Sequence, residues 1–201
     1  MRLTRGFCFA LLAVGLAAGG PARAQERWNY EISYQASFPS SRMKEFADRA
    51  SWRGGGVDLR RETGRHSSIG LSLGWHVFDR RSDQPVSIGG VDLSGDHIRY
   101  VNSFPMLINA ELCAGGRQHA RFLLGAGAGG YLMEHRVEIG SDAIGETRFH
   151  FGFAPEAGVR IPLGELSGVV LRGRYNYALS SKDIPRQSYW TVGIGYAWSD
   201  W

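Results

Sequence analysis

The sequence has few cysteines and lacks long hydrophobic runs. Of its 201 residues only Cys8 and Cys113 are cysteines, so a disulfide framework is excluded as the means of holding the fold. After residue 24 no apolar run approaches the roughly 18 to 20 residues that a membrane-spanning helix needs. A helical membrane protein is therefore excluded as well.

The first 24 residues have the pattern of a secretory signal peptide. Arg2 and Arg5 form a positive n-region, residues 7–18 an apolar h-region, and Ala22-Arg23-Ala24 a small-residue cleavage site. We expect a single mature domain over residues 25–201. Removing Arg2, Arg5 and Arg23 lowers the 23 basic residues to 20, against 19 acidic ones. This near balance argues against a nucleic-acid partner.

Alternation with a period of two runs through the mature chain. At its start Trp28, Tyr30 and Ile32 alternate with Asn29 and Glu31, and the pattern continues to Phe38. Near the end, residues 190–198 repeat it. Strands of about 9 to 11 residues are long enough to cross a bilayer at a tilt, whereas strands of soluble proteins average about 5 to 6. The pattern therefore predicts strands of membrane length.

Six more alternating segments lie between these two. They cover residues 53–62, 68–79, 97–113, 119–133, 148–161 and 168–180. The connections 63–67, 114–118 and 162–167 are short, whereas the connections 39–52, 80–96, 134–147 and 181–186 are mostly longer. Short turns at one end and longer loops at the other are typical of outer-membrane barrels. The sequence predicts an all-β fold, an eight-stranded antiparallel up-and-down transmembrane β-barrel.

The residue types on the two faces decide which one points inward. The bulky residues share one face and match a lipid-facing band, whereas the other face combines small residues with charges and suits a narrow lumen. A soluble barrel would reverse this arrangement. We expect a lumen charge network of Glu31, Asp58, Arg60, Arg99, Glu111, Arg121, Glu156, Arg160, Arg172 and Arg174, with His76 beside it.

Aromatic residues are expected at both membrane interfaces. Because an even number of strands returns the chain to its starting side, Trp28 and Trp198 are assigned to the periplasmic interface. Trp75, Phe149, Tyr177 and Trp190 are assigned to the outer girdle.

The closing third of the chain resembles a known family. The stretches Phe149-His-Phe-Gly-Phe-Ala-Pro-Glu-Ala-Gly-Val-Arg-Ile-Pro-Leu163, Leu171-Arg-Gly-Arg-Tyr-Asn-Tyr177 and Trp190-Thr-Val-Gly-Ile-Gly-Tyr196 are similar to small Gram-negative outer-membrane barrels. These include the transmembrane domain of outer-membrane protein A and the opacity-type adhesins. The resemblance implies an outer-membrane location and recognition of a terminal aromatic residue by the barrel-assembly machinery. Either Trp198 or Trp201 can serve as that signal.

Two patterns suggest other chemistry. The glycines of residues 125–130 match G-x-G-x-x-G spacing, but the chain continues as strand, and small residues in a crowded lumen explain them better. Glu134, His135, Glu138 and Asp142 gather potential metal ligands, although a charged, solvated loop is the favoured interpretation. No metal, other cofactor or catalytic residue is predicted.

A lipid A-modifying hydrolase is the alternative from another functional class. The outer-membrane deacylase has a histidine and a serine together on a late strand, and the comparable stretch here, Arg174–Ser181, contains no histidine. Ser180 or Ser181 would need a distant base such as His150 to become a nucleophile. A narrow channel is a further alternative.

The first long connection contains a helical pattern. Met43, Phe46, Ala47 and Ala50 have the spacing of a short amphipathic helix within residues 41–50. It can rest on the outer leaflet, fold over the barrel mouth, or be a loop with helical propensity only.

Hairpin register predicts two lumen pairs. Placing Pro162 opposite Gly168 sets Glu156 across from Arg174, and placing Cys113 opposite His119 sets Glu111 across from Arg121. We expect a non-enzymatic monomer with a structural or interaction role. Its expected partners are outer-membrane lipids and lipopolysaccharide, the assembly machinery, and an unidentified partner of the external loops.

Overall fold

A computed structural model describes most of residues 27–200. It covers residues 27–40, 43–46, 49–82, 86–88, 91–93, 97–116, 118–139, 142–181 and 185–200. The predicted signal peptide and Trp201 lie outside these residues. No helix in this part of the chain is long and apolar enough to span a membrane.

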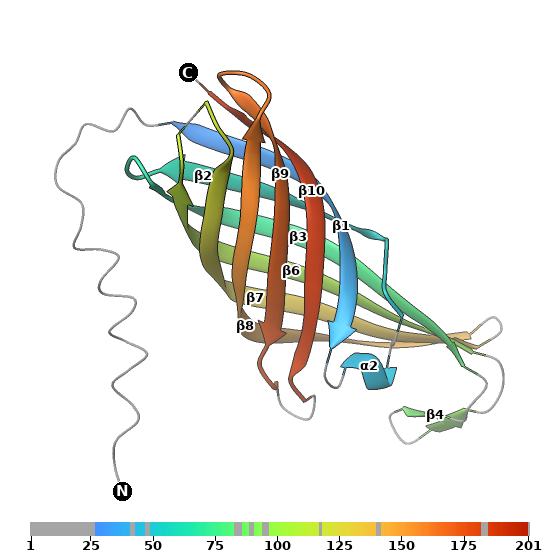
Figure 1. The fold of residues 1–201 in the computed structure, drawn as a ribbon. Coiled ribbons are helices and arrows are strands. Elements are labelled where there is room, and N and C mark those ends of the chain that lie inside the picture. Colours follow the sequence, from blue (N-terminus) through green and yellow to red (C-terminus); the bar gives the residue numbers. More distant parts are fainter. Residues whose placement is uncertain are drawn as a thin grey trace, which may run out of the picture.

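Eight antiparallel strands form a closed barrel (Figure 1). They are β1 (Trp28–Ser40), β2 (Gly54–Glu62), β3 (Ser67–Ser82), β6 (His97–Ala114), β7 (Arg121–Ile139), β8 (Asp142–Pro162), β9 (Ser167–Ala178) and β10 (Gln187–Ser199). Each strand pairs with its sequence neighbour in the barrel, and β1 closes the ring against β10. A separate small hairpin consists of β4 (Val86–Ile88) and β5 (Val91–Leu93). The predicted fold class is confirmed.

The two ends of the barrel differ, as Figure 1 shows. The turn end carries residues 63–66, 115–116, 118–120 and 163–166 together with the start of β1 and the end of β10, where the Trp28 backbone N–H donates to Asp200 Oδ1 at 2.7 Å. The loop end carries the remaining connections. It also holds the helix α2 (Met43–Phe46), which lies beside the outer end of β1.

The burial pattern confirms which face points inward. On β1, Ile32 and Tyr34 are exposed while Glu31, Ser33 and Gln35 are buried. Because successive side chains of a strand point to opposite faces, the polar positions line the lumen and the apolar ones cover the outside. The outside of the barrel is therefore apolar, and polar side chains occupy much of the lumen, whereas a soluble barrel has a polar outer surface.

Two prolines lie inside barrel strands at points where one ladder is interrupted. Pro155 interrupts the β8–β9 pairing, while the β7–β8 pairing continues past it. Pro105 likewise interrupts β3–β6 but not β6–β7. Proline has no N–H to donate, so each of these strands loses hydrogen bonding on one side only.

The prediction that residues 134–147 form a loop is wrong. β7 and β8 stay paired as far as Ile139 opposite Asp142, so Glu134 and His135 are strand residues. The alternation of apolar and polar residues fades there because a strand outside the bilayer needs no lipid-facing side. The backbone hydrogen bonds between the two strands do not depend on that alternation and continue.

Candidate functional site

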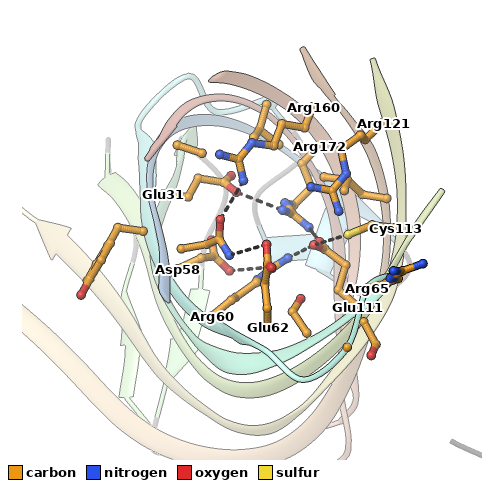
Figure 2. A pocket seen from close by; sticks show the side chains of 18 residues that line it. Glu31, Asp58, Arg60, Glu62, Arg65, Glu111, Cys113, Arg121, Arg160 and Arg172 are labelled. Atoms are coloured by element: carbon orange, nitrogen blue, oxygen red, sulfur yellow. Dashed lines mark hydrogen bonds and ion pairs between the residues drawn. The ribbon is translucent and has the colours of Figure 1, made fainter. Parts of the chain in front are cut away.

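Seven charged residues form one network in the half of the lumen nearer the turn end. They come from five strands and are all buried: Glu31 on β1, Asp58 and Arg60 on β2, Glu111 on β6, Glu156 on β8, and Arg172 and Arg174 on β9. Period-two alternation places each of them on the inward face. Figure 2 shows most of this network from the cavity beside it.

Each arginine of the network contacts at least two carboxylates. Arg60 lies 2.8 Å from Asp58 and 3.0 Å from Glu156 (Nη2 to the carboxylate oxygen), and its other terminal nitrogen pairs with Glu111. Arg172 Nη2 lies 2.9 Å from Glu31 Oε2, and its Nη1 contacts both Glu111 and Glu156. The carboxylates therefore bridge strands that are not adjacent in the barrel.

The predicted pair of Glu156 and Arg174 is confirmed. The two residues are opposite each other in the β8–β9 ladder, and Arg174 Nη2 lies 2.6 Å from Glu156 Oε2. Arg174 also lies 3.3 Å from Asp58. Glu156 thus contacts three arginines and is the most connected carboxylate of the network.

The predicted pair of Glu111 and Arg121 is wrong. The β6–β7 turn spans residues 115–120 and includes Gly115 with a φ of 118°, a left-handed conformation that suits glycine. The longer turn moves the register by four positions, so Glu111 faces Gly125 and Arg121 faces Arg160. Because four is even, both side chains still point inward.

The remaining predicted lumen residues form no ion pair with the network in the part of the chain that the structure describes. Arg121 and Arg160 are partly buried at the turn end. His76 is buried nearer the loop end, and its Nδ1 lies 3.0 Å from Ser37 Oγ. The side chain of Arg99 lies outside the described part of the chain.

The half of the lumen nearer the loop end is filled by an apolar cluster. Its buried members are Met43, Phe78, Val101, Leu107, Tyr131, Met133, Ala154, Ala178 and Tyr189. Met43 belongs to α2, so this helix folds over the barrel mouth and inserts a side chain. Sequence periodicity predicted a helix within residues 41–50 and left open where its apolar side would lie. The described helix is shorter, Met43–Phe46, and Ala50 lies outside it.

The glycine stretch of β7 fits this crowded interior. A Cβ on Gly127 would overlap the Asn109 side chain, and one on Gly129 would overlap the Met106 carbonyl oxygen. The residues remain in a strand, with no helix following them. The structural interpretation of G-x-G-x-x-G is therefore confirmed.

The predicted hydrolase residues do not form a nucleophile–base pair. His150 is buried and its Nδ1 lies 2.8 Å from the Leu179 carbonyl oxygen, whereas Ser180 is exposed. The serine–histidine contact that does occur joins Ser37 and His76 inside the lumen, where Tyr189 packs against the imidazole. Sequence reasoning missed this contact because its two residues lie on strands that are not neighbours.

The residues considered as metal ligands are distributed along the β7–β8 hairpin. Glu134 Oε2 accepts a hydrogen bond from Asn102 Nδ2 at 3.1 Å, and His135 faces Glu146 across the ladder. The side chains of Glu138 and Asp142 lie outside the described part. Within that part no three His, Cys, Asp or Glu side chains are grouped to hold a metal ion.

Aromatic side chains lie on the outer face near both ends. Trp198 stacks on Tyr30 at a ring-centroid distance of 5.6 Å at the turn end, where β1 begins with Trp28. Toward the loop end Trp75 stacks on Phe104, Phe149 contacts Phe151, and Tyr175 contacts both Tyr177 and Trp190. Their role as interface anchors stays a prediction.

Comparison with known proteins identifies the fold. No family model and no curated protein matches the sequence. Among solved structures, the outer membrane protein OprG from Pseudomonas aeruginosa matches with a TM-score of 0.53 and 12% identity, over 87% of this chain and 96% of that chain. A major outer membrane protein from Thermus thermophilus matches with a TM-score of 0.52 and 11% identity, over 85% and 99%.

The N-terminal β-barrel domain of Pseudomonas aeruginosa OprF matches with a TM-score of 0.50 and 16% identity, over 88% of this chain and all of that one. At such low identity the similarity shows the fold alone. The resemblance to small outer-membrane barrels is confirmed at that level.

Proposed function

We propose that this chain is a non-enzymatic outer-membrane barrel that binds a partner through a sheet projecting beyond its loop end. The observation that carries the proposal is the unequal length of the strands. β3, β6, β7 and β8 continue past the barrel as a four-stranded sheet, whereas β2 and β9 stop short of it (Figure 1).

The outer surface supports insertion in a membrane. Large apolar side chains stay exposed around the barrel, among them Ile32, Val57, Leu71, Leu73, Ile108, Phe122, Leu124, Phe151, Val192 and Ile194. A soluble protein rarely exposes so large a continuous apolar surface. In a bilayer the closed ladder satisfies the backbone hydrogen bonds, and the apolar band faces lipid.

The filled lumen argues against a channel. The charged network occupies one half and the apolar cluster the other, with Met43 inserted from α2. Eight strands leave an interior only wide enough for side chains. The protein is therefore better suited to a structural or interaction role than to transport.

The projecting sheet has an exposed edge at the outer part of β8. β9 pairs with β8 only from Gly152 inward, so in the described structure Gly145, Glu146 and Thr147 pair with β7 alone. All three residues are exposed. An unpaired strand edge presents alternate N–H and C=O groups on which an extended segment of another protein can add as a strand.

One substitution tests this edge without breaking the hairpin. The Phe151 carbonyl accepts from Leu179 on the β9 side, and alternation places the N–H of Thr147 on that same, open side. Thr147→Pro should therefore remove an edge donor while keeping the ladder to β7. Thr147→Val is the matched control, because it keeps the N–H and the β-branched shape.

The experiment is a binding screen of secreted and surface-exposed proteins against the protein in native outer-membrane vesicles. A ligand of the edge should bind at least about tenfold more weakly to Thr147→Pro and equally well to Thr147→Val. Recovery of the protein outside the outer-membrane fraction would contradict the location. Porin-sized conductance in a planar bilayer, or a mass change of lipid A in expressing cells, would contradict the non-enzymatic, closed-barrel role.

A further inference from the structure

Two arginines at the turn end face each other without a carboxylate between them. Arg121 on β7 and Arg160 on β8 are directly opposite in the ladder, and both line the cavity of Figure 2. Directly opposed residues have Cβ atoms about 4.5 to 5.5 Å apart, and like charges at that spacing repel. Their juxtaposition needs a compensating negative charge.

Glu31 and Glu62 line the same cavity and supply part of that charge, but among the described residues no ion pair joins either carboxylate to Arg121 or Arg160. Arg160 Nη1 donates to the Asn29 side-chain oxygen at 2.9 Å, which is a neutral acceptor. Arg121 Nε is buried and has no hydrogen-bond partner within the described residues. Arg172 beside them already uses Glu31, Glu111 and Glu156.

Space for a ligand adjoins both guanidinium groups. One cavity of about 40 Å³ is lined by Arg121, Arg160 and three more arginines, and by four carboxylates. Of these carboxylates, Glu31, Asp58 and Glu111 already pair with arginines of the network, and Glu62 is the fourth. A second cavity, of about 20 Å³, lies toward the turns and is also lined by both arginines, together with Arg27, Glu62 and Glu165. Since a single water needs roughly 10 to 15 Å³, the first cavity has room for about three waters or a small polyatomic ion.

We propose that Arg121 and Arg160 form a binding site for a phosphate-class oxyanion at the turn end of the barrel. The planar guanidinium group presents paired N–H donors that match the oxygens of phosphate, and two of them can hold one anion from both sides. The anion would neutralise the opposed charges. If the barrel is oriented as in other outer-membrane proteins, this site opens to the periplasm, where either free phosphate or the phosphate of an inner-leaflet lipid can reach it.

The test measures binding of inorganic phosphate to the full mature barrel in maltoside micelles, which contain no phosphate. Titration calorimetry should show saturable binding for the wild type. Arg121→Gln and Arg160→Gln should each weaken it at least about tenfold. Arg186→Gln is the matched control, since Arg186 is an exposed arginine outside both cavities, and it should leave the affinity unchanged.

The unfolding midpoint gives a second readout. Without phosphate, Arg121→Gln should raise the unfolding midpoint because it removes the repulsion, whereas added phosphate should raise the midpoint of the wild type only. Heat-dependent gel migration verifies that each variant is folded. Absence of saturable phosphate binding by the wild type, or equal losses in Arg186→Gln, would overturn the proposal.

A last arm separates the two sources of phosphate. The titration is repeated in phosphatidylglycerol nanodiscs. An unchanged affinity for added phosphate supports the free ion as ligand. A weaker affinity in the nanodiscs means that the lipid competes with added phosphate, and loss of this competition in Arg121→Gln supports a lipid phosphate as ligand. Both results support the oxyanion site.

Discussion

The two halves of the lumen are packed in different ways by the same eight strands. Near the turn end, buried charges contact one another across the barrel, and near the loop end apolar side chains fill the space. A buried charge depends on named partners at fixed distances, whereas an apolar side chain contacts whatever surrounds it. We expect the charged half to be sensitive to single changes and the apolar half to tolerate substitutions that conserve volume.

Removing Glu156 should have the largest effect. Glu156→Ala leaves Arg60, Arg172 and Arg174 without one shared carboxylate, and we expect a loss of about 3 to 5 kcal/mol of unfolding free energy where burial is complete. Reversible unfolding in detergent or lipid measures it. Adding Arg174→Ala should recover part of the loss, and a coupling energy of zero within error would mean that the contact is not formed.

Glu111 tests the charged half further, because its ion-pair partners in the structure differ from the arginine that hairpin register alone predicts. Glu111→Ala should destabilise the barrel by about 3 kcal/mol, somewhat less than Glu156→Ala, because Glu111 contacts two arginines instead of three. Double-mutant cycles should show coupling with Arg60 and none with Arg121. Coupling between Glu111 and Arg121 would support the hairpin register with the shorter turn and contradict the register of the structure.

Met43 tests the apolar half. Met43→Ala should cost about 2 kcal/mol, because it removes a fully buried side chain from the cluster under α2. Met43→Leu conserves volume and should cost less than about 1.5 kcal/mol. Denaturant unfolding of the three proteins provides the measurement, and equal losses for both variants would show that this half also depends on one specific side chain.

Much of this architecture follows from local periodicity. Alternation at Glu31, Glu156 and Arg174 placed each side chain inward, because the pleat of a strand permits only two directions. The hairpin at Pro162 and Gly168 also placed Glu156 opposite Arg174, since its turn is short and its two strands are adjacent in sequence. Prediction succeeded wherever one strand or one tight turn contained all the information.

Other features left no clear pattern of residue types in the sequence. The β6–β7 turn ends two residues later than the predicted connection Ala114–Gln118, and this difference gave Glu111 other partners. The extension of β7 and β8 beyond the barrel was missed because the apolar alternation stops while the backbone pairing continues. The Ser37–His76 contact joins β1 and β3, which are not adjacent in the barrel, and it leaves no local signal.

The sequence by itself determined the strand count, the antiparallel order, the inward face and the helical tendency at Met43, because these follow from residue type and spacing along one segment. Only the tertiary structure decided the partners of Glu111, the place of Met43 in the mouth, and the opposed pair of Arg121 and Arg160. Closing the sheet into a ring brings side chains of several strands to one level of the lumen. Which of them meet there depends on the exact register of every hairpin at once.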